Sequence, residues 1–117
     1  MTFEEASAWL FDQLPTYQRQ GAAAYKTDLD GTWAVLKTME RPDLKLPHVI
    51  HVAGTNGKGS VCQAVNNALV DQGLKVGLFT SPHLFDFRER MRVNGETPSE
   101  RWVIEFIESQ KMIFERL

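Results

Sequence analysis

The chain of 117 residues is 43% hydrophobic and 24% charged, which is an ordinary composition for one globular domain. Its formal net charge of −2 argues against a broad nucleic-acid-binding surface, so we expect no nucleic-acid partner. No apolar stretch approaches the roughly 20 residues that span a bilayer, and no leader-like segment opens the chain, so we expect a cytoplasmic protein without a membrane partner.

The first part of the chain predicts two helices. Thr2 and Glu5 are spaced as a capping box, and apolar residues at helical spacing extend the first helix to about Leu14. A second helix is predicted from Asp28 or Asp30 to about Met39, and Arg41-Pro42 ends it.

A glycine-rich segment follows a predicted strand and opens a third helix. The apolar stretch Pro47–Ala53 predicts a buried strand, and helical spacing resumes after Ser60 and continues to about Gly73. Glycines at such a junction let successive N–H groups point at one anion, and the helix dipole adds to the same field. We therefore predict a phosphate cradle for a nucleotide, formed by the residues Thr55, Asn56, Gly57, Lys58, Gly59 and Ser60.

This loop departs from the strict phosphate-loop pattern. The first glycine of that pattern falls on Val52, and Gly59 follows Lys58 where Ser or Thr is expected. The alternative interpretation is a glycine-rich turn with a chance lysine. The flanking strand and helix favour nucleotide binding, with Lys58 reaching the outer phosphates.

A further strand is predicted over Lys75–Thr80, so the order strand, helix, strand indicates a right-handed parallel crossover. We predict an α/β fold with a parallel sheet. Asn94-Gly95 predicts a turn, and the last helix is expected to begin with Thr97 as its cap and Pro98 in its first position.

The last helix carries more apolar surface than the other predicted elements can cover. A parallel sheet also needs more strands than this sequence provides. We expect either part of a larger enzyme or a domain that pairs with another copy through this helix, and a small self-sufficient domain is the alternative. The oligomeric state stays open.

Polar groups follow the second predicted strand, beside the cradle if the two strands are parallel neighbours. Ser81 is a candidate magnesium ligand, with bonding to its own turn as the alternative. Arg88, Arg90 and Arg92 would share one face of an extended segment and suit an anionic substrate, or else form a solvated strand edge.

Two other residue types carry weaker signals. His83 is interpreted as a locally bonded loop side chain, with a ligand role as the alternative, and His48 and His51 flank the predicted strand with no partner at metal-ligand spacing. Cys62 is the only cysteine, and we interpret it as a small buried residue of the third helix.

Taken together, these segments resemble the folylpolyglutamate synthase and dihydrofolate synthase family of the Mur ligase superfamily. The resemblance is carried by three motifs and a weaker fourth: Val52-Ala53-Gly54-Thr55-Asn56-Gly57-Lys58-Gly59-Ser60, Gly77-Leu78-Phe79-Thr80-Ser81-Pro82-His83-Leu84, Phe87-Arg88-Glu89-Arg90-Met91-Arg92-Val93-Asn94-Gly95 and Tyr25-Lys26-Thr27-Asp28-Leu29. It covers the chain from about Tyr17 onward.

The resemblance implies an ATP-dependent amide ligase of folate biosynthesis and one-carbon metabolism. In such an enzyme magnesium-bound ATP phosphorylates a carboxylate of folate or dihydropteroate, and the amine of L-glutamate then attacks the acyl phosphate. The resemblance implies that Lys58 stabilises the transferring phosphoryl group, that Ser81 binds magnesium, and that Asp28 and Leu29 line the pterin side. Arg88 and Arg90 remain candidates for substrate binding.

The resemblance also implies that residues 1–117 form the N-terminal portion of the ATP-binding domain. Family members add further metal-site residues and a C-terminal domain that binds glutamate, so we expect weak nucleotide binding and negligible turnover from this chain alone. The alternatives are a Mur-type ligase of cell-wall precursors, a nucleotide-binding module without catalysis, and a structural fragment with an empty loop.

Overall fold

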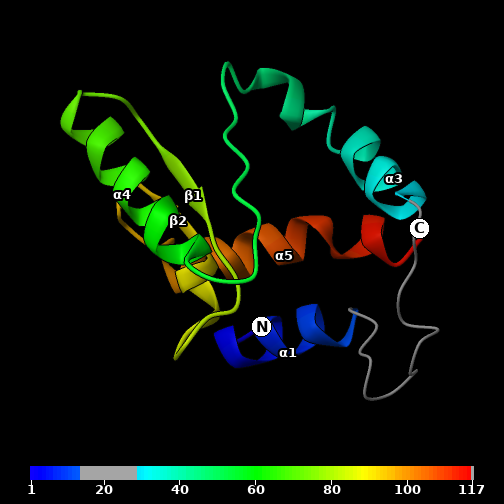
Figure 1. Cartoon of the computed structure of the whole chain (residues 1–117). Helices are drawn as coiled ribbons and strands as arrows, with labels where there is room; N and C mark the ends of the chain where they lie inside the picture. Colours follow the sequence, from blue (N-terminus) through cyan, green and yellow to red (C-terminus); the bar gives the residue numbers. More distant parts are fainter. Residues whose placement is uncertain (14–28, 117) are drawn as a thin grey trace. The chain divides into compact units, whose positions relative to one another are not determined.

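The computed structural model describes residues 1–13 and 29–116 (Figure 1). The chain divides into two compact units. The first contains Met1–Val49 and Glu100–Leu117, and the second contains Ile50–Ser99. Each unit is described by itself.

The first unit opens with α1, Phe3–Asp12, and its start is the predicted capping box. The backbone N–H of Glu5 donates to Thr2 Oγ1 at 3.1 Å, and the N–H of Thr2 donates to Glu5 Oε2 at 2.7 Å. Two of the N–H groups that a helix leaves without partners are thereby satisfied. The prediction for this helix is confirmed over its described residues.

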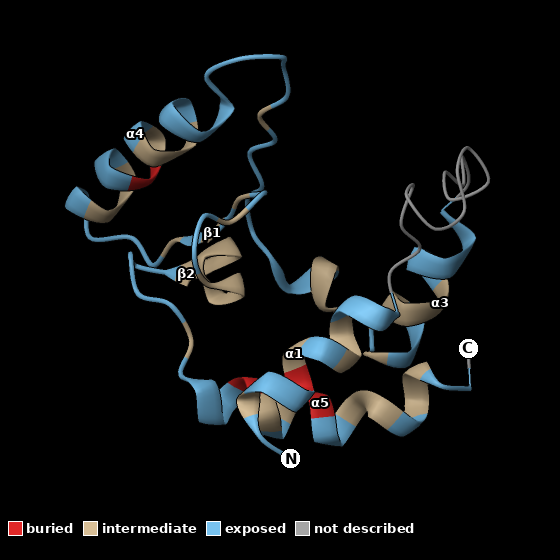
Figure 2. Cartoon of the chain, turned by 90° about the horizontal axis from the view of Figure 1, so that it is seen from below, coloured by how far each residue is buried: buried red, intermediate tan, exposed pale blue. Residues whose placement is uncertain are grey.

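Helix α5, Glu100–Phe114, packs against α1 and covers its apolar stripe. The contact contains the buried side chains Ala6, Val103 and Ile107, which form the red patches on the two helices in Figure 2. At the far end of α1, Trp9 stacks on Phe114 with ring centroids 6.3 Å apart. Part of the apolar face expected to need an outside partner is therefore covered by α1.

The start of α5 corrects the sequence prediction. Thr97 and Pro98 lie ahead of the helix, and Glu100 is its first residue. The helix therefore begins two residues later than the capping pattern indicated.

Helix α3, Asp30–Thr38, confirms the second predicted helix. After it, Arg41 adopts a left-handed conformation with φ of 53° ahead of the short 3₁₀ helix η2, Pro42–Lys45. Its guanidinium makes two bonds to Asp43, at 2.9 and 2.7 Å, and lowers the pKa of that carboxyl below its usual range. This ion pair connects the residue that precedes η2 with the first turn of η2.

The second unit contains α4, Lys58–Asp71, and a two-stranded sheet of β1, Gly77–Phe79, and β2, Met91–Val93. The strands are antiparallel, with Leu78 opposite Arg92. The α/β class is confirmed. The only sheet among the described residues is antiparallel, however, so the predicted parallel crossover is not found there.

The predicted strand Pro47–Ala53 is wrong for the described structure. These residues belong to no strand, and Val49 and Ile50 are 72% and 63% exposed. A parallel strand needs neighbours that take up its backbone hydrogen bonds and layers that bury both faces. The described part of the chain supplies neither to this segment.

A tight turn at Asn94-Gly95 follows β2, as predicted. Both residues have positive φ, 51° and 82°, and Val93 pairs with Glu96 across them. Positive φ at both central positions is the geometry of a two-residue hairpin. The Asn94 side chain also accepts a hydrogen bond from the N–H of Val76 at 2.8 Å, which ties the turn to the residue ahead of β1.

Among the described residues, no helix is both long and apolar enough to cross a membrane.

Candidate functional site

The glycine loop, Gly54–Ser60, is held by two glycines with positive φ. Gly54 has φ of 153°, and Gly57, the residue that precedes α4, has φ of 78°. A side chain at either position would be strained, because L-residues seldom adopt these conformations. The loop can therefore turn sharply from the extended segment into the helix.

The N-terminus of α4 has no cap of its own. No side chain bonds to its first N–H groups, and no acidic residue lies in its first turn. The first backbone bond of the helix runs from the N–H of Val61 to the carbonyl of Gly57, at 3.0 Å. The N–H groups of Lys58, Gly59 and Ser60 precede that bond at the positive end of the helix dipole, where an anion is stabilised.

Lys58 adds a full positive charge to the same place. Its ammonium donates a hydrogen bond to the carbonyl of Gly54, so the side chain folds back across the glycine loop. Thr55, Asn56 and Ser60 are exposed on this loop. The loop thus brings together hydroxyls, N–H groups and one ammonium, which are the donors that suit a phosphate.

A second segment, the 80–86 loop, connects β1 to the 3₁₀ helix η3, Phe87–Arg90. The antiparallel ladder closes its base, and the N–H of Thr80 donates to the carbonyl of Arg90 at 3.0 Å. Ser81 is exposed at the start of this loop. Its hydroxyl is thereby accessible, as a metal ligand requires.

The expectation that Arg88, Arg90 and Arg92 share one extended face is wrong. Arg88 and Arg90 lie in η3, and only Arg92 lies in a strand. The reason is a capping box in which Asp86 and Glu89 start the 3₁₀ helix. The alternation of charged and apolar residues predicted an extended segment, but local side-chain bonds to the backbone stabilise a 3₁₀ helix here.

Each of the two η3 arginines has a partner of its own. Arg88 bonds to Asp86 through Nη2 at 2.8 Å and to the carbonyl of Pro98 at 3.2 Å. The bonds that Asp86 accepts from the side chain of Arg88 and, second, from its backbone N–H lower the pKa of Asp86. Arg90 Nε donates to His83 Nδ1 at 2.8 Å.

Glu89 has a role that the sequence motifs did not predict. Its carboxylate accepts hydrogen bonds from the backbone N–H groups of Leu84, Phe85 and Asp86, at 3.1, 2.9 and 2.7 Å. These bonds lower the pKa of Glu89. The signal was present, because Asp86 and Glu89 have the same spacing as the Thr2 and Glu5 box.

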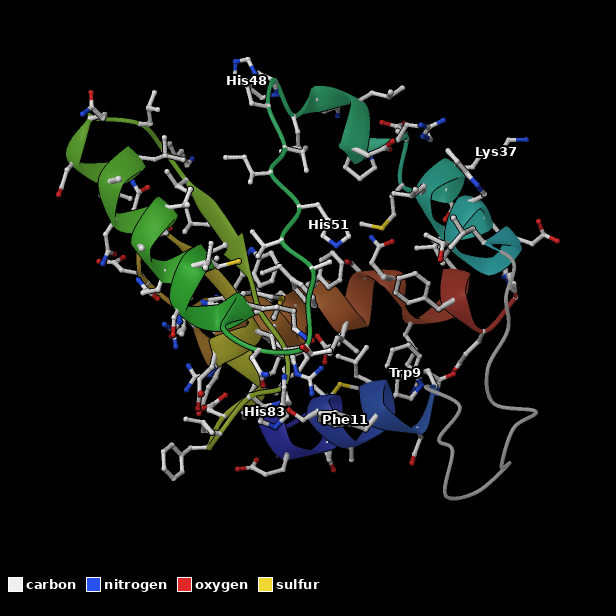
Figure 3. All side chains as sticks on the ribbon, in the orientation of Figure 1. Trp9, Phe11, Lys37, His48, His51 and His83 are labelled. Carbon is white, nitrogen blue, oxygen red and sulfur yellow. The ribbon has the colours of Figure 1, made fainter. Side chains whose placement is uncertain are left out.

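The weaker interpretations hold in part: His83 is bonded locally, to Arg90, and Cys62 is less buried than expected. Figure 3 shows His51 on the extended segment before the glycine loop and His83 on the 80–86 loop, with their rings well apart. Among the described residues, no group of three His, Cys, Asp or Glu side chains is arranged to hold a metal ion. Cys62 is a free, half-buried thiol in α4.

The two pterin-side residues remain predictions. Asp28 lies outside the described residues, and Leu29 is 62% exposed at the start of α3 in the other unit. The adjacency of Ser81 and the glycine loop also stays a prediction, because it was derived from a parallel strand pair.

Several solved structures are similar to this chain, and they include folylpolyglutamate synthases. A folylpolyglutamate synthase from Thermotoga maritima matches with a TM-score of 0.80 and 37% identity, over 95% of this chain and 24% of that one. A folylpolyglutamate synthase in complex with AMPPCP and folate matches with a TM-score of 0.80 and 28% identity, over 99% of this chain and 26% of that one. In sequence, folylpolyglutamate synthase from Arabidopsis thaliana is 36% identical over 114 residues, or 96% of this chain.

The chain belongs to the folylpolyglutamate synthase family. A bifunctional folylpolyglutamate synthase/dihydrofolate synthase with Mn, AMPPNP and L-glutamate bound also matches, with a TM-score of 0.58 and 35% identity over 81% of this chain and 21% of that one. No family model matches the sequence. The chain spans 18% of the Arabidopsis synthase, so it corresponds to a small part of its relatives in this family.

Proposed function

We propose that the chain supplies the ATP-binding part of an amide ligase that adds L-glutamate to folate, to dihydropteroate, or to both. The observation that carries the proposal is the uncapped start of α4, where Gly57 turns the chain and the Lys58 ammonium lies across the glycine loop. Two similar solved structures support the choice of substrates. One is a complex with AMPPCP and folate, and the other has Mn, AMPPNP and L-glutamate bound.

The donor set of the glycine loop fits a triphosphate. Three N–H groups at a helix start and one ammonium attract negative charge, and α4 has no acidic first-turn residue to repel it. Thr55, Asn56 and Ser60 provide additional short polar groups at the same loop. Gly57 and Gly59 let the backbone approach the phosphates closely.

Lys58 is the residue we assign to catalysis. Transfer of a phosphoryl group to a carboxylate makes an acyl phosphate and leaves ADP, and charge accumulates on the transferred oxygens. An ammonium held over the loop stabilises that charge more than it stabilises the bound substrate. Lys58 is therefore expected to matter more to the rate than any apolar contact.

Ser81 is proposed as a ligand of magnesium, which would neutralise phosphate charge when bound. Arg88 and Arg90 are proposed to face the anionic substrate, with Asp28 and Leu29 on the pterin side. The bonds of Arg88 to Asp86 and of Arg90 to His83 also hold their own loop, so these two arginines have a structural role in addition.

The placement within a larger enzyme belongs to the proposal as well. We propose that residues 1–117 correspond to the N-terminal portion of the ATP-binding domain and that the enzyme works in the cytoplasm. The coverage of the Arabidopsis relative, 18% of its length, supports a partial domain.

Calorimetric titration with magnesium-ATP tests the proposal on three proteins: the unchanged chain, Lys58→Ala, and Lys75→Ala as a matched control. Lys75 is an exposed lysine of the same unit, outside the glycine loop. We expect Lys58→Ala to weaken binding at least about tenfold, because it removes a charge-assisted contact, and Lys75→Ala to change it little.

Two outcomes would contradict the proposal. The first is the absence of magnesium-ATP binding by the unchanged chain. The second is an equal loss in both lysine variants, which would indicate general charge attraction and not a built cradle. Binding without any phosphate release in the presence of folate and glutamate is the expected behaviour of the chain alone.

A further inference from the structure

We propose that Glu89 is a positioning residue that clasps three successive backbone N–H groups and thereby fixes the loop that presents Ser81. This inference rests on the proposed function, because Ser81 acts there as the metal ligand. It adds a residue that touches neither nucleotide nor metal.

Both carboxylate oxygens of Glu89 take part. Oε1 accepts from the N–H groups of Phe85 and Asp86 at 2.9 and 2.7 Å, and Oε2 accepts from the N–H of Leu84 at 3.1 Å. Three consecutive N–H groups that converge on one anion define a single backbone conformation. Charge-assisted bonds of this kind are stronger than bonds between neutral groups.

Apolar burial does not hold this part of the loop. The side chains of Leu84 and Phe85 are 82% and 95% exposed. Burial of such side chains is the usual source of stability in a loop that packs on a core, and here it contributes little. The hydrogen bonds to Glu89 therefore determine the path of the backbone from Leu84 to Asp86.

Ser81, the residue proposed to bind the metal, lies between two fixed points of its loop. On one side, the N–H of Thr80 is bonded to the carbonyl of Arg90 at the base of the sheet. On the other side, Leu84 is bonded to Glu89. Only Ser81, Pro82 and His83 span the interval, and His83 is itself bonded to Arg90. Release of Glu89 frees one of the two ends.

The test compares Glu89→Ala and Glu89→Gln with Glu96→Gln as the control. In Glu89→Gln one oxygen becomes an NH₂ group, so at least one backbone N–H faces a donor; in Glu89→Ala all three bonds are lost. Glu96 is an exposed carboxylate of the same unit, beyond the turn at Asn94-Gly95. Its variant removes one negative charge without touching the clasp.

The first measurement is amide hydrogen exchange of the chain without ligands. We expect exchange at Leu84, Phe85 and Asp86 to accelerate about tenfold or more in Glu89→Ala and by a smaller factor in Glu89→Gln. Exchange in α4 and α5 should not change, which shows that the variants fold. Unaltered exchange at the three amides would overturn the proposal.

The second measurement is ATP affinity with magnesium and with EDTA in its place. Magnesium increases the ATP affinity by some factor, and Glu89→Ala should reduce that factor at least about fivefold. The affinity for metal-free ATP should not change, because the glycine loop is unaffected. Lys58→Ala should lose affinity in both conditions. If Glu89→Ala instead disrupted the whole unit, the ATP affinity would fall both with magnesium and with EDTA.

The outcomes separate the two proposals. If the unchanged chain binds ATP with a magnesium increment and Glu89→Ala retains all of it, the positioning role fails and the proposed function stands. If the unchanged chain binds no ATP in either condition, the proposed function fails and the role of Glu89 in it fails as well. Binding of ATP without a magnesium increment overturns the metal-side assignment of this loop.

Discussion

The starts of α1 and α4 solve the same chemical problem in opposite ways. Both helices begin with N–H groups that have no partner within the helix. At α1, Thr2 and Glu5 satisfy two of them, and Glu4 and Glu5 place negative charge in the first turn. At α4 no side chain caps the helix, and its first turn contains no carboxylate.

The short helix η3 follows the pattern of α1. Asp86 and Glu89 cap it, and both carboxylates are bonded to backbone N–H groups. Acidic residues therefore complete the starts of α1 and η3. The start of α4 receives a left-handed glycine and a lysine, which leaves its positive field available to an anion from outside.

Giving α4 a carboxylate like that of α1 should produce the largest effect. In Ser60→Glu, the acid occupies the third helical position, where Glu5 sits in α1. We expect the free energy of unfolding to rise by about 0.3–1 kcal/mol, because the charge complements the helix dipole. Magnesium-ATP affinity should fall at least about a hundredfold, since the same charge repels the phosphates at the start of the helix.

Ser60→Gln is the matched control, because it has the same shape without the charge. Urea unfolding and calorimetric titration of both variants measure the two effects separately. A glutamate variant that gains stability and still binds magnesium-ATP as well as the glutamine variant would contradict the comparison between the two helix starts.

The next effect concerns the backbone conformation that opens α4. Gly57→Ala places a side chain at φ of 78°, which should cost about 1–2 kcal/mol of unfolding free energy. Gly59→Ala lies within the helix, and an added Cβ there meets no atom within 4 Å. It should stabilise the chain by up to about 1 kcal/mol. Equal effects in urea unfolding would show that the conformation of Gly57 is not what shapes the loop.

The sequence was sufficient for several features whose signal is local. The capping box at Thr2, the helix after Lys58 and the turn at Asn94-Gly95 were predicted, because each depends on a few adjacent residues. The glycine loop was found for the same reason. Glycines, a lysine and a helix start are close in sequence and act together.

The sequence was insufficient where structure depends on distant partners. The strand expected at Pro47–Ala53 required neighbours that the described residues do not provide, and β2 formed from a stretch interpreted as a charged face. The alternation of Arg88, Arg90 and Arg92 suggested an extended segment, yet the local bonds of Asp86 and Glu89 produced a 3₁₀ turn. Side-chain bonds to the backbone were thus underestimated relative to periodicity.

The smallest expected effect is the pH dependence of the η3 cap. The backbone N–H groups of Asp86, Leu84 and Phe85 lower the pKa of Glu89, with a smaller contribution from the charge of Arg92, and the bond to Arg88 lowers the pKa of Asp86. Because both values are lowered on folding, the clasp is complete above the pKa of the unfolded groups, and it is lost as the pH falls through the lowered values.

In an NMR titration, the amide signals of Leu84, Phe85 and Asp86 should move together with a midpoint below the ordinary glutamate value of about 4.3. Glu89→Gln should remove the part of this transition that belongs to Glu89 and leave the part that belongs to Asp86. A midpoint at or above the ordinary value would mean that the three N–H groups are not held by the carboxylate in solution, and η3 would then lose the feature that distinguishes its start from that of α4.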